Sequence, residues 1–274
     1  MTTPTSKKRR KGCGIGCGIF ALVVIIAISL TVYIVGHPVR EAKRSEQDLN
    51  ERFAVASEYT PPPNGSVAPE RIEAFLRVRE RLHKHCTGFQ VVLDNVLHLE
   101  GLEQDQEKSK STKLYETVRS FKELFGIGPK FLKFVKARNS ALLKEEMGLG
   151  EYIYIYVLAY SDQLRQLSIS KYAQMDKAYI SDRTRTELTQ ILRNQLATLN
   201  TGERSMPNND MASALQEEIS ALEQGRQSFP WQHGQPPAIA ASFSPYVNSL
   251  ARLYCEGITK IELLQKNKGF QVKG

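Results

Sequence analysis

The longest apolar stretch of the chain lies near its N-terminus. No residue from 13 to 35 is charged, and nearly every residue of Ile19–Val35 is apolar. A helix of about 20 such residues spans the hydrocarbon core of a bilayer. A cleaved signal peptide needs a shorter apolar core followed by small residues, and Tyr33–Pro38 offers no such site. The pattern therefore predicts one uncleaved transmembrane helix over residues 13–35; a cleaved peptide and a buried helix are the alternatives.

Charged residues of both signs dominate the segment that follows. Eight of them lie from Arg40 to Arg52, with few apolar residues between them, which is typical of a solvated helix. Such a helix would raise the rest of the chain by roughly 30 Å. Pro61–Ser66 then breaks the helix and predicts a semi-rigid hinge. We therefore expect a stalk and hinge over residues 36–66 and a folded domain over residues 67–274.

Apolar residues recur at helical spacing through most of this domain. Pro69 is a favourable first helical residue, and the apolar positions behind it follow the period of a half-buried helix. The same period predicts further helices, including residues 131–147, 182–199, 208–224 and 244–264. The stretch 228–242 is rich in proline and is expected to be irregular.

Residues 151–160 alternate aromatic and β-branched side chains, as a strand does. However, helical spacing continues from Ile153 to Leu167, and Glu151 lies three residues after Gly148, as in a capping box with glycine as the cap. We expect a helix here, with a strand as the alternative. The whole pattern predicts an all-α fold: one transmembrane helix, a helical stalk and an extracytoplasmic bundle of about six or seven helices.

The charge distribution adds an orientation. The formal net charge is +8, and a cluster before the apolar stretch supplies five of these charges. This basic cluster consists of Lys7, Lys8, Arg9, Arg10 and Lys11. The remaining +3 is close to balance for a domain of this size, so nucleic acid is not expected as a partner. Basic flanks stay in the cytoplasm, which predicts a cytoplasmic tail over residues 1–12 and places residues 36–274 in the periplasm or outside the cell.

Four glycines flank the start of the predicted span. Gly12, Gly14, Gly16 and Gly18 contain two overlapping Gly-x-x-x-Gly spacings. This spacing lets two helix backbones approach closely and is compatible with a homodimer through the transmembrane helix. A tolerance for small residues at the headgroup boundary is the simpler interpretation.

Two cysteines fall in the exported part, Cys86 and Cys255. In an oxidising compartment such a pair is a candidate disulfide, and two reduced, buried thiols are the alternative. His83 and His85 lie close to Cys86, but these residues do not share one helix face, so no metal site is expected. No cofactor motif or catalytic signature is present, and an enzyme is not the expected class.

The tyrosine segment is the best candidate for a ligand site. Tyr152, Tyr156 and Tyr160 share one helical face, with Glu151 beside them and Arg138 shortly before them in the chain. Such a face lines a ligand pocket in one interpretation, and packs in the core in the other.

The pattern Arg138-Asn-x-Ala-Leu-Leu followed by Gly150-Glu-Tyr-x-Tyr-Ile-Tyr resembles a segment of uncharacterised bacterial single-pass exported membrane proteins. The resemblance covers about a tenth of the chain and implies no activity.

The hypothesis that accounts best for these features is a membrane-anchored interaction or scaffold module that docks a protein or another component of the cell envelope. A small-ligand sensor built around residues 151–160 is the alternative. Lys130, Lys133 and Lys136 also form a basic helix surface that could face lipid headgroups or an anionic wall polymer, although a solvated face is the simpler interpretation.

Overall fold

The computed structural model describes residues 39–91, 128–169, 181–201 and 209–263. Every regular element in these ranges is a helix, so the prediction of an all-α fold is confirmed for them. None of these helices is both long enough and apolar enough to cross a bilayer. The predicted span, residues 13–35, lies outside the described ranges, as do the basic cluster and the four glycines.

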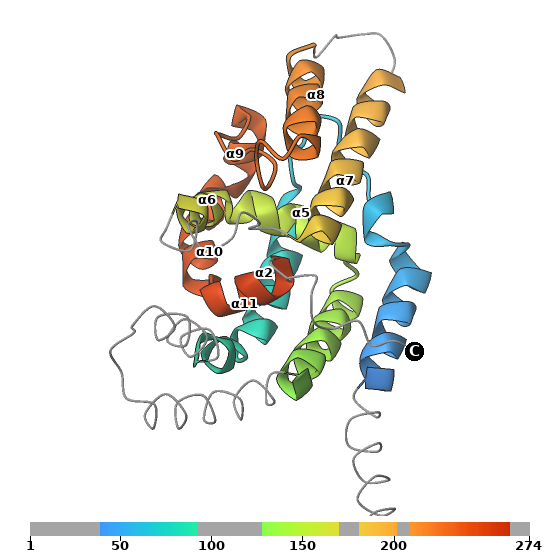
Figure 1. Cartoon of the computed structure of the whole chain (residues 1–274), viewed down its shortest axis with the longest axis vertical. Coiled ribbons are helices and arrows are strands. Elements are labelled where there is room, and N and C mark those ends of the chain that lie inside the picture. Colours follow the sequence, from blue (N-terminus) through green and yellow to red (C-terminus); the bar gives the residue numbers. More distant parts are fainter. Residues whose placement is uncertain (1–38, 92–127, 170–180, 202–208, 264–274) are drawn as a thin grey trace, which may run out of the picture.

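The labelled helices are η1 (Ala56–Glu58), α2 (Pro69–His83), α5 (Leu149–Ala159), α6 (Ser161–Ile169), α7 (Asp182–Thr201), α8 (Asn209–Glu223), α9 (Pro237–Phe243), η3 (Ser244–Tyr246), α10 (Val247–Leu253) and α11 (Glu256–Leu263) (Figure 1). Residues 39–53, 86–91 and 128–144 are also helical. The helices are more numerous and shorter than the six or seven expected. One reason is that the backbone leaves the helical conformation at Tyr160 and at Tyr254, which divides two of the predicted helices.

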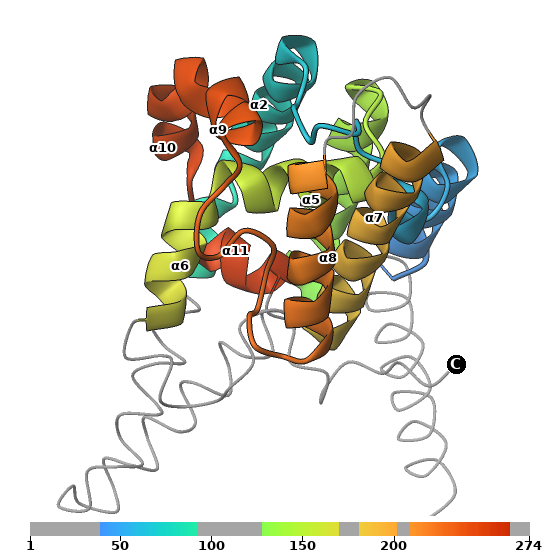
Figure 2. The ribbon, with the colours of Figure 1, turned by 90° about the horizontal axis from the view of Figure 1, so that it is seen from above.

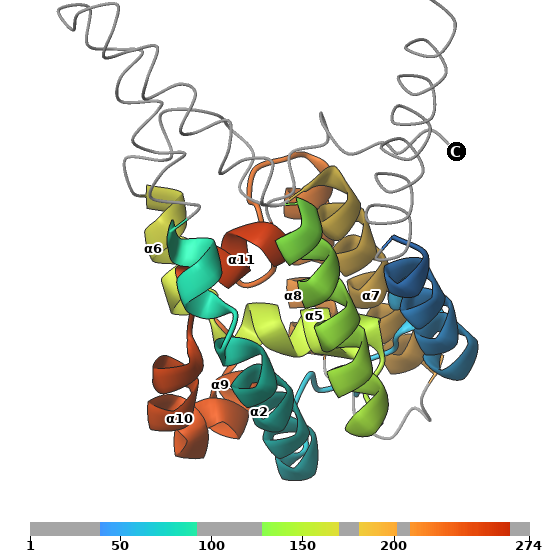
Figure 3. The ribbon, with the colours of Figure 1, turned by 90° about the horizontal axis from the view of Figure 1, so that it is seen from below.

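The tyrosine-rich segment forms α5, the central helix of the molecule. It lies in the middle of all three views, with α7 and α8 packed together on one side and α9 and α10 on the other (Figures 1, 2 and 3). Gly148 is the residue that caps its start, and nearly every side chain from Leu149 to Leu158 is buried. A helix makes its backbone hydrogen bonds internally, so a helix that is apolar all round can be covered on every side. This explains why the alternation of aromatic and β-branched side chains in this segment did not produce a strand.

The predicted stalk is wrong for the part of it that the structure describes. Residues 39–53 are helical, but they pack against the domain instead of standing clear of it. Leu49 is only 1% exposed and Ala42 only 5% exposed. A helix with one narrow apolar stripe becomes stable once a second helix covers that stripe, and here residues 128–144 provide part of the cover. The folded body therefore begins at least as early as residue 39, not at residue 67.

Two polar contacts set the register of these two helices. In the first turn of residues 39–53, Glu41 Oε2 lies 2.8 Å from Nζ of Lys136, in the middle of residues 128–144. In the last turn, Arg52 Nη2 lies 2.9 Å from Oε1 of Glu146, just beyond residue 144. Each pair is separated by about the same number of residues in the chain. The two helices are therefore parallel, and they begin at the same end of the molecule (Figures 1 and 3).

The predicted hinge is also held in place. The Asn194 side-chain amide on α7 donates hydrogen bonds to the carbonyl oxygens of Ser57 and Tyr59, at 2.9 and 3.0 Å. Gly150 lies so close to η1 that a Cβ atom there would come within 2.1 Å of the Ala56 carbonyl oxygen. Within the predicted hinge itself, the Gln195 side-chain amide of α7 donates to the Pro63 carbonyl at 3.3 Å, and the Tyr154 hydroxyl of α5 lies 3.5 Å from the Gly65 carbonyl. The Pro-rich segment is therefore fixed against α5 and α7.

Candidate functional site

The three tyrosines of α5 lie together, as their spacing predicts, and they lie in the core. Tyr152, Tyr156 and Tyr160 are at most 1% exposed. Their rings contact one another in sequence, with centroid separations of 5.8 Å and 4.9 Å. Phe75 of α2 packs against all three rings. The face that was a candidate pocket wall is therefore covered by the side chains of a neighbouring helix.

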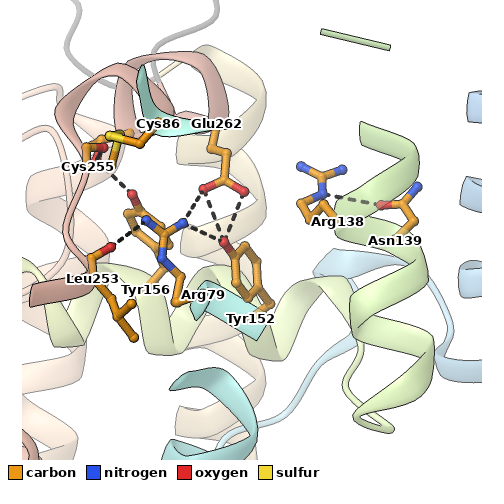
Figure 4. Close-up of polar contacts among 10 residues, drawn as sticks. Arg79, Cys86, Arg138, Asn139, Tyr152, Tyr156, Leu253, Cys255 and Glu262 are labelled. Atoms are coloured by element: carbon orange, nitrogen blue, oxygen red, sulfur yellow. Dashed lines mark hydrogen bonds and ion pairs between the residues drawn. A yellow bond between two sulfur atoms is a disulfide. The ribbon is translucent and has the colours of Figure 1, made fainter. Parts of the chain in front are cut away.

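A buried arginine occupies the space in front of these rings. Arg79 of α2 is 1% exposed, and its guanidinium lies 4.7 Å from the ring centre of Tyr156 and 5.6 Å from that of Tyr160. Its Nη1 donates to the Tyr152 hydroxyl at 3.1 Å, and its Nη2 donates to the Leu253 carbonyl at 3.3 Å (Figure 4). Aromatic faces and a carbonyl dipole thus replace much of the water that a guanidinium normally binds.

Glu262 of α11 provides the opposing charge. Its Oε2 lies 3.3 Å from Arg79 Nη1, and the Tyr152 hydroxyl lies 3.0 Å from its Oε1 (Figure 4). The carboxylate side chain is only 3% exposed. Burial raises the pKa of Glu262 above its ordinary value, and the positive charges of Arg79 and Arg138 act in the opposite direction.

The disulfide ties together the two segments that carry this buried pair. Cys86 follows α2, Cys255 precedes α11, and their sulfur atoms are bonded. Just beyond it, the Thr259 hydroxyl donates to the Cys255 carbonyl at 2.8 Å and lies 2.7 Å from the Tyr156 hydroxyl. The disulfide and the Arg79–Glu262 ion pair, with the tyrosine hydroxyls that contact them, therefore hold α2, α5 and α11 together.

Two of the predicted site residues do not join the tyrosines in this cluster. Glu151 lies on another face of α5 and forms a two-point ion pair with Arg71, in which both N···O distances are 2.6 Å. Arg138 donates to Asn139 at 3.2 Å and is near enough to Glu262 to influence its pKa, but no hydrogen bond connects it to the tyrosines among the described residues (Figure 4). The structure therefore separates Glu151 from the candidate site and leaves Arg138 at its edge.

Sequence reasoning missed Arg79 and Glu262. A signal was present for Arg79, because it falls on the apolar stripe of α2 between Phe75 and Leu82, at helical spacing. Glu262 lies one turn after Thr259 and two turns after Cys255, on the helix face that also carries the disulfide-bonded cysteine. Its role could be recognised only after that face had been placed against α2.

A separate hollow of about 180 Å³ lies between α6 and the segment before α9. Trp231 lines it, has a backbone φ of 60°, and has a buried indole Nε1 without a hydrogen-bond partner among the described residues. Asp162 and Arg165, which pair with each other at 2.8 Å, also line this hollow. Pockets for organic ligands are usually about 300–1,000 Å³, so this hollow suits at most a few water molecules or a very small molecule.

No protein-family model, curated protein or solved structure matches the chain. Within the described ranges, no group of three metal-ligating side chains is present. Burial also raises the pKa of Tyr152 and Tyr156, so these hydroxyls stay neutral at physiological pH and act as hydrogen-bonding groups. The cluster thus has the chemistry of a structural polar network.

Proposed function

We propose that this chain is a membrane-anchored interaction module whose domain lies outside the cytoplasm. The observation that carries the proposal is the Cys86–Cys255 disulfide. Disulfides of this kind persist in oxidising compartments and are rare in the cytoplasm. The predicted span at residues 13–35 and the basic cluster before it give the same orientation independently. Membrane attachment and export together describe a protein that presents a folded domain at the envelope.

Docking has more support than ligand sensing because of how the tyrosine face is filled. The rings of Tyr152 and Tyr156 contact Arg79 and Phe75 of the same chain. A ligand at this position would have to displace a fully buried guanidinium and leave Glu262 without its cation, which is costly. The exposed surface of the helices is therefore the better candidate for recognition.

Thiol labelling of freshly lysed cells tests the compartment of the domain. The chain has four cysteines, of which Cys13 and Cys17 lie outside the described residues. A maleimide polymer added to cells lysed under denaturing conditions should attach to no more than two cysteines, and to all four after reduction. Attachment to Cys86 or Cys255 before reduction, found by mass spectrometry, would contradict the proposed compartment.

Crosslinking of the full-length chain in envelope membranes tests the docking. We expect a discrete crosslinked partner that is recovered with the wild-type chain and lost with the Cys86→Ser/Cys255→Ser variant, which retains the anchor. Recovery of the same proteins with both chains would show that the contacts do not depend on the folded domain. If crosslinkers of different reach recover no partner at all, the docking proposal fails.

A further inference from the structure

One end of the molecule has an excess of basic side chains. It is the end at which residues 39–53 and 128–144 both begin (Figure 3). We define the basic end as the exposed side chains of Arg40, Lys43, Arg44, Lys130 and Lys133. None of these five forms an ion pair with another described residue. They are distributed over two helices that are far apart in the sequence, so the charge excess is a product of the fold.

Most of the described carboxylates around the basic end are paired, whereas Asp48, one turn after Arg44, is exposed and has no ion pair among the described residues. The pairs are Glu41 with Lys136 at 2.8 Å, Glu46 with Arg183 at 3.7 Å, and Asp182 with Arg185 at 2.6 Å. These pairs come from all three helices that meet there, namely residues 39–53, residues 128–144 and α7. Two negative charges remain against the five unpaired bases, namely Asp48 and one of the two carboxylates, Glu46 and Glu187, that share Arg183. The described groups at this end therefore keep a net charge of +3.

The chain itself limits how far this end can lie from the predicted span. Glu41 is six residues beyond residue 35, which corresponds to about 9 Å in a helix and at most about 20 Å in an extended chain. Lys130 precedes Lys136, the partner of Glu41, by six residues in the parallel helix. It therefore lies about 9 Å further from the body along the helix axis, on the side of the span. With the chain leaving the body in the direction in which residues 39–53 begin, Lys130 lies within about 11 Å of the level of residue 35.

The distance between the basic end and the membrane decides whether its charge interacts with the lipid headgroups. The Debye length at physiological ionic strength is about 8 Å, and the headgroup layer adds several ångströms on each side of the hydrocarbon core. A solvated stalk of roughly 30 Å would have placed Lys130 and Lys133 beyond the reach of the lipid charge, and only Arg40, Lys43 and Arg44 at its start would have stayed close. The docking of residues 39–53 on the domain brings all five bases within that reach.

We infer that the basic end of the domain binds anionic phospholipid headgroups on the outer surface of the membrane that holds the anchor. Arg40 and Arg44 offer guanidinium groups that can form two parallel hydrogen bonds with a phosphate, and the three lysines provide compact charges around them. The contact fixes the tilt of the domain on the bilayer and thus decides which surfaces face outward. This inference rests on the proposed anchor.

Lysine acylation of the full-length chain in nanodiscs tests the contact. One preparation contains phosphatidylcholine alone, and the other contains equal parts of phosphatidylcholine and phosphatidylglycerol. Only the neutral amine reacts with an N-hydroxysuccinimide ester, and an anionic surface keeps nearby amines protonated. We expect Lys43, Lys130 and Lys133 to react roughly threefold more slowly in the anionic nanodiscs, and the difference to disappear at high salt. Lys144, about 21 Å along the helix from Lys130, is the internal control.

Two charge-reversal variants make the test independent of any general effect of the lipid. Lys130→Glu/Lys133→Glu should bring the acylation rate of Lys43 in anionic nanodiscs back to its rate in phosphatidylcholine, whereas Lys144→Glu should not change it. Circular dichroism checks that both variants remain helical. Equal rates for the wild-type lysines in both lipids would overturn the lipid contact and leave the anchor standing. A chain that does not co-purify with either nanodisc would overturn the anchor and the contact with it.

Discussion

Replacing Arg79 with methionine tests whether the buried charge pair is structurally essential. Methionine has a similar length and no charge, so the change removes the cation and retains most of the packing volume. It leaves Glu262 without its ion-pair partner and the Leu253 carbonyl without a donor. Removing one partner from a buried ion pair typically costs about 3–5 kcal/mol. Loss of the guanidinium contacts with the rings of Tyr156 and Tyr160 adds up to about 1–2 kcal/mol.

The companion variant removes the other charge. In Arg79→Met/Glu262→Leu both ions are replaced by apolar side chains, and such exchanges are often neutral or even stabilising. We therefore expect the double variant to be more stable than Arg79→Met alone, with a coupling free energy of about 2–3 kcal/mol between the two positions. This non-additivity is what distinguishes a charge pair from two residues that merely fill space.

Trp231 provides the probe, since it is the one tryptophan of the chain and is 4% exposed. The assay is a urea titration of the full-length chain in a nonionic detergent, followed by the emission of this residue under non-reducing conditions. Two results would contradict a structural role for the charge pair. One is a cost below about 1 kcal/mol for Arg79→Met, and the other is a double variant whose cost equals the sum of the two single costs.

Three further variants, and one matched control, test other parts of the fold by the same titration. Gly150→Ala should cost about 1–3 kcal/mol because its Cβ would clash with the backbone of η1, whereas Gly88→Ala, with no atom within 4 Å of its new Cβ, should be nearly neutral or slightly stabilising. Leu49→Ala should cost about 2–5 kcal/mol if residues 39–53 are docked, and an effect under about 0.5 kcal/mol would restore the solvated stalk. Hydrogen bonds and ion pairs from two arginines lower the pKa of Glu145 in the folded chain. The carboxylate therefore stabilises the fold above pH 4.5, the pKa of Glu145 in the unfolded chain, and this contribution is lost as the pH falls through the lower folded-state pKa. Glu145→Gln should reduce the loss of stability in that acid range, and an unchanged acid dependence would contradict the assignment.

The local structure was largely readable from the sequence. Helical periodicity and start signals located α2, α7 and α8 to within a few residues, because these helices bury apolar positions at helical spacing, and α2 and α7 begin at a proline and at a serine cap. Ser181 is an example, since its hydroxyl accepts the backbone N–H of Thr184 at the start of α7 at 3.1 Å. These features depend on neighbours within four residues, and such neighbours are fixed by the sequence itself.

The contacts between distant segments were decided by the tertiary structure. Residues 39–53 look like a solvated stalk because two or three apolar side chains do not stabilise a helix alone. Those side chains become a buried face only when residues 128–144 cover them. Arg79 and Glu262 look like surface charges because burying either one alone is prohibitive. Their burial becomes favourable only when folding brings the cation, the carboxylate and the tyrosine rings together at once. A sequence lists such groups separately, whereas their desolvation and mutual attraction depend on distances that exist only in the folded chain.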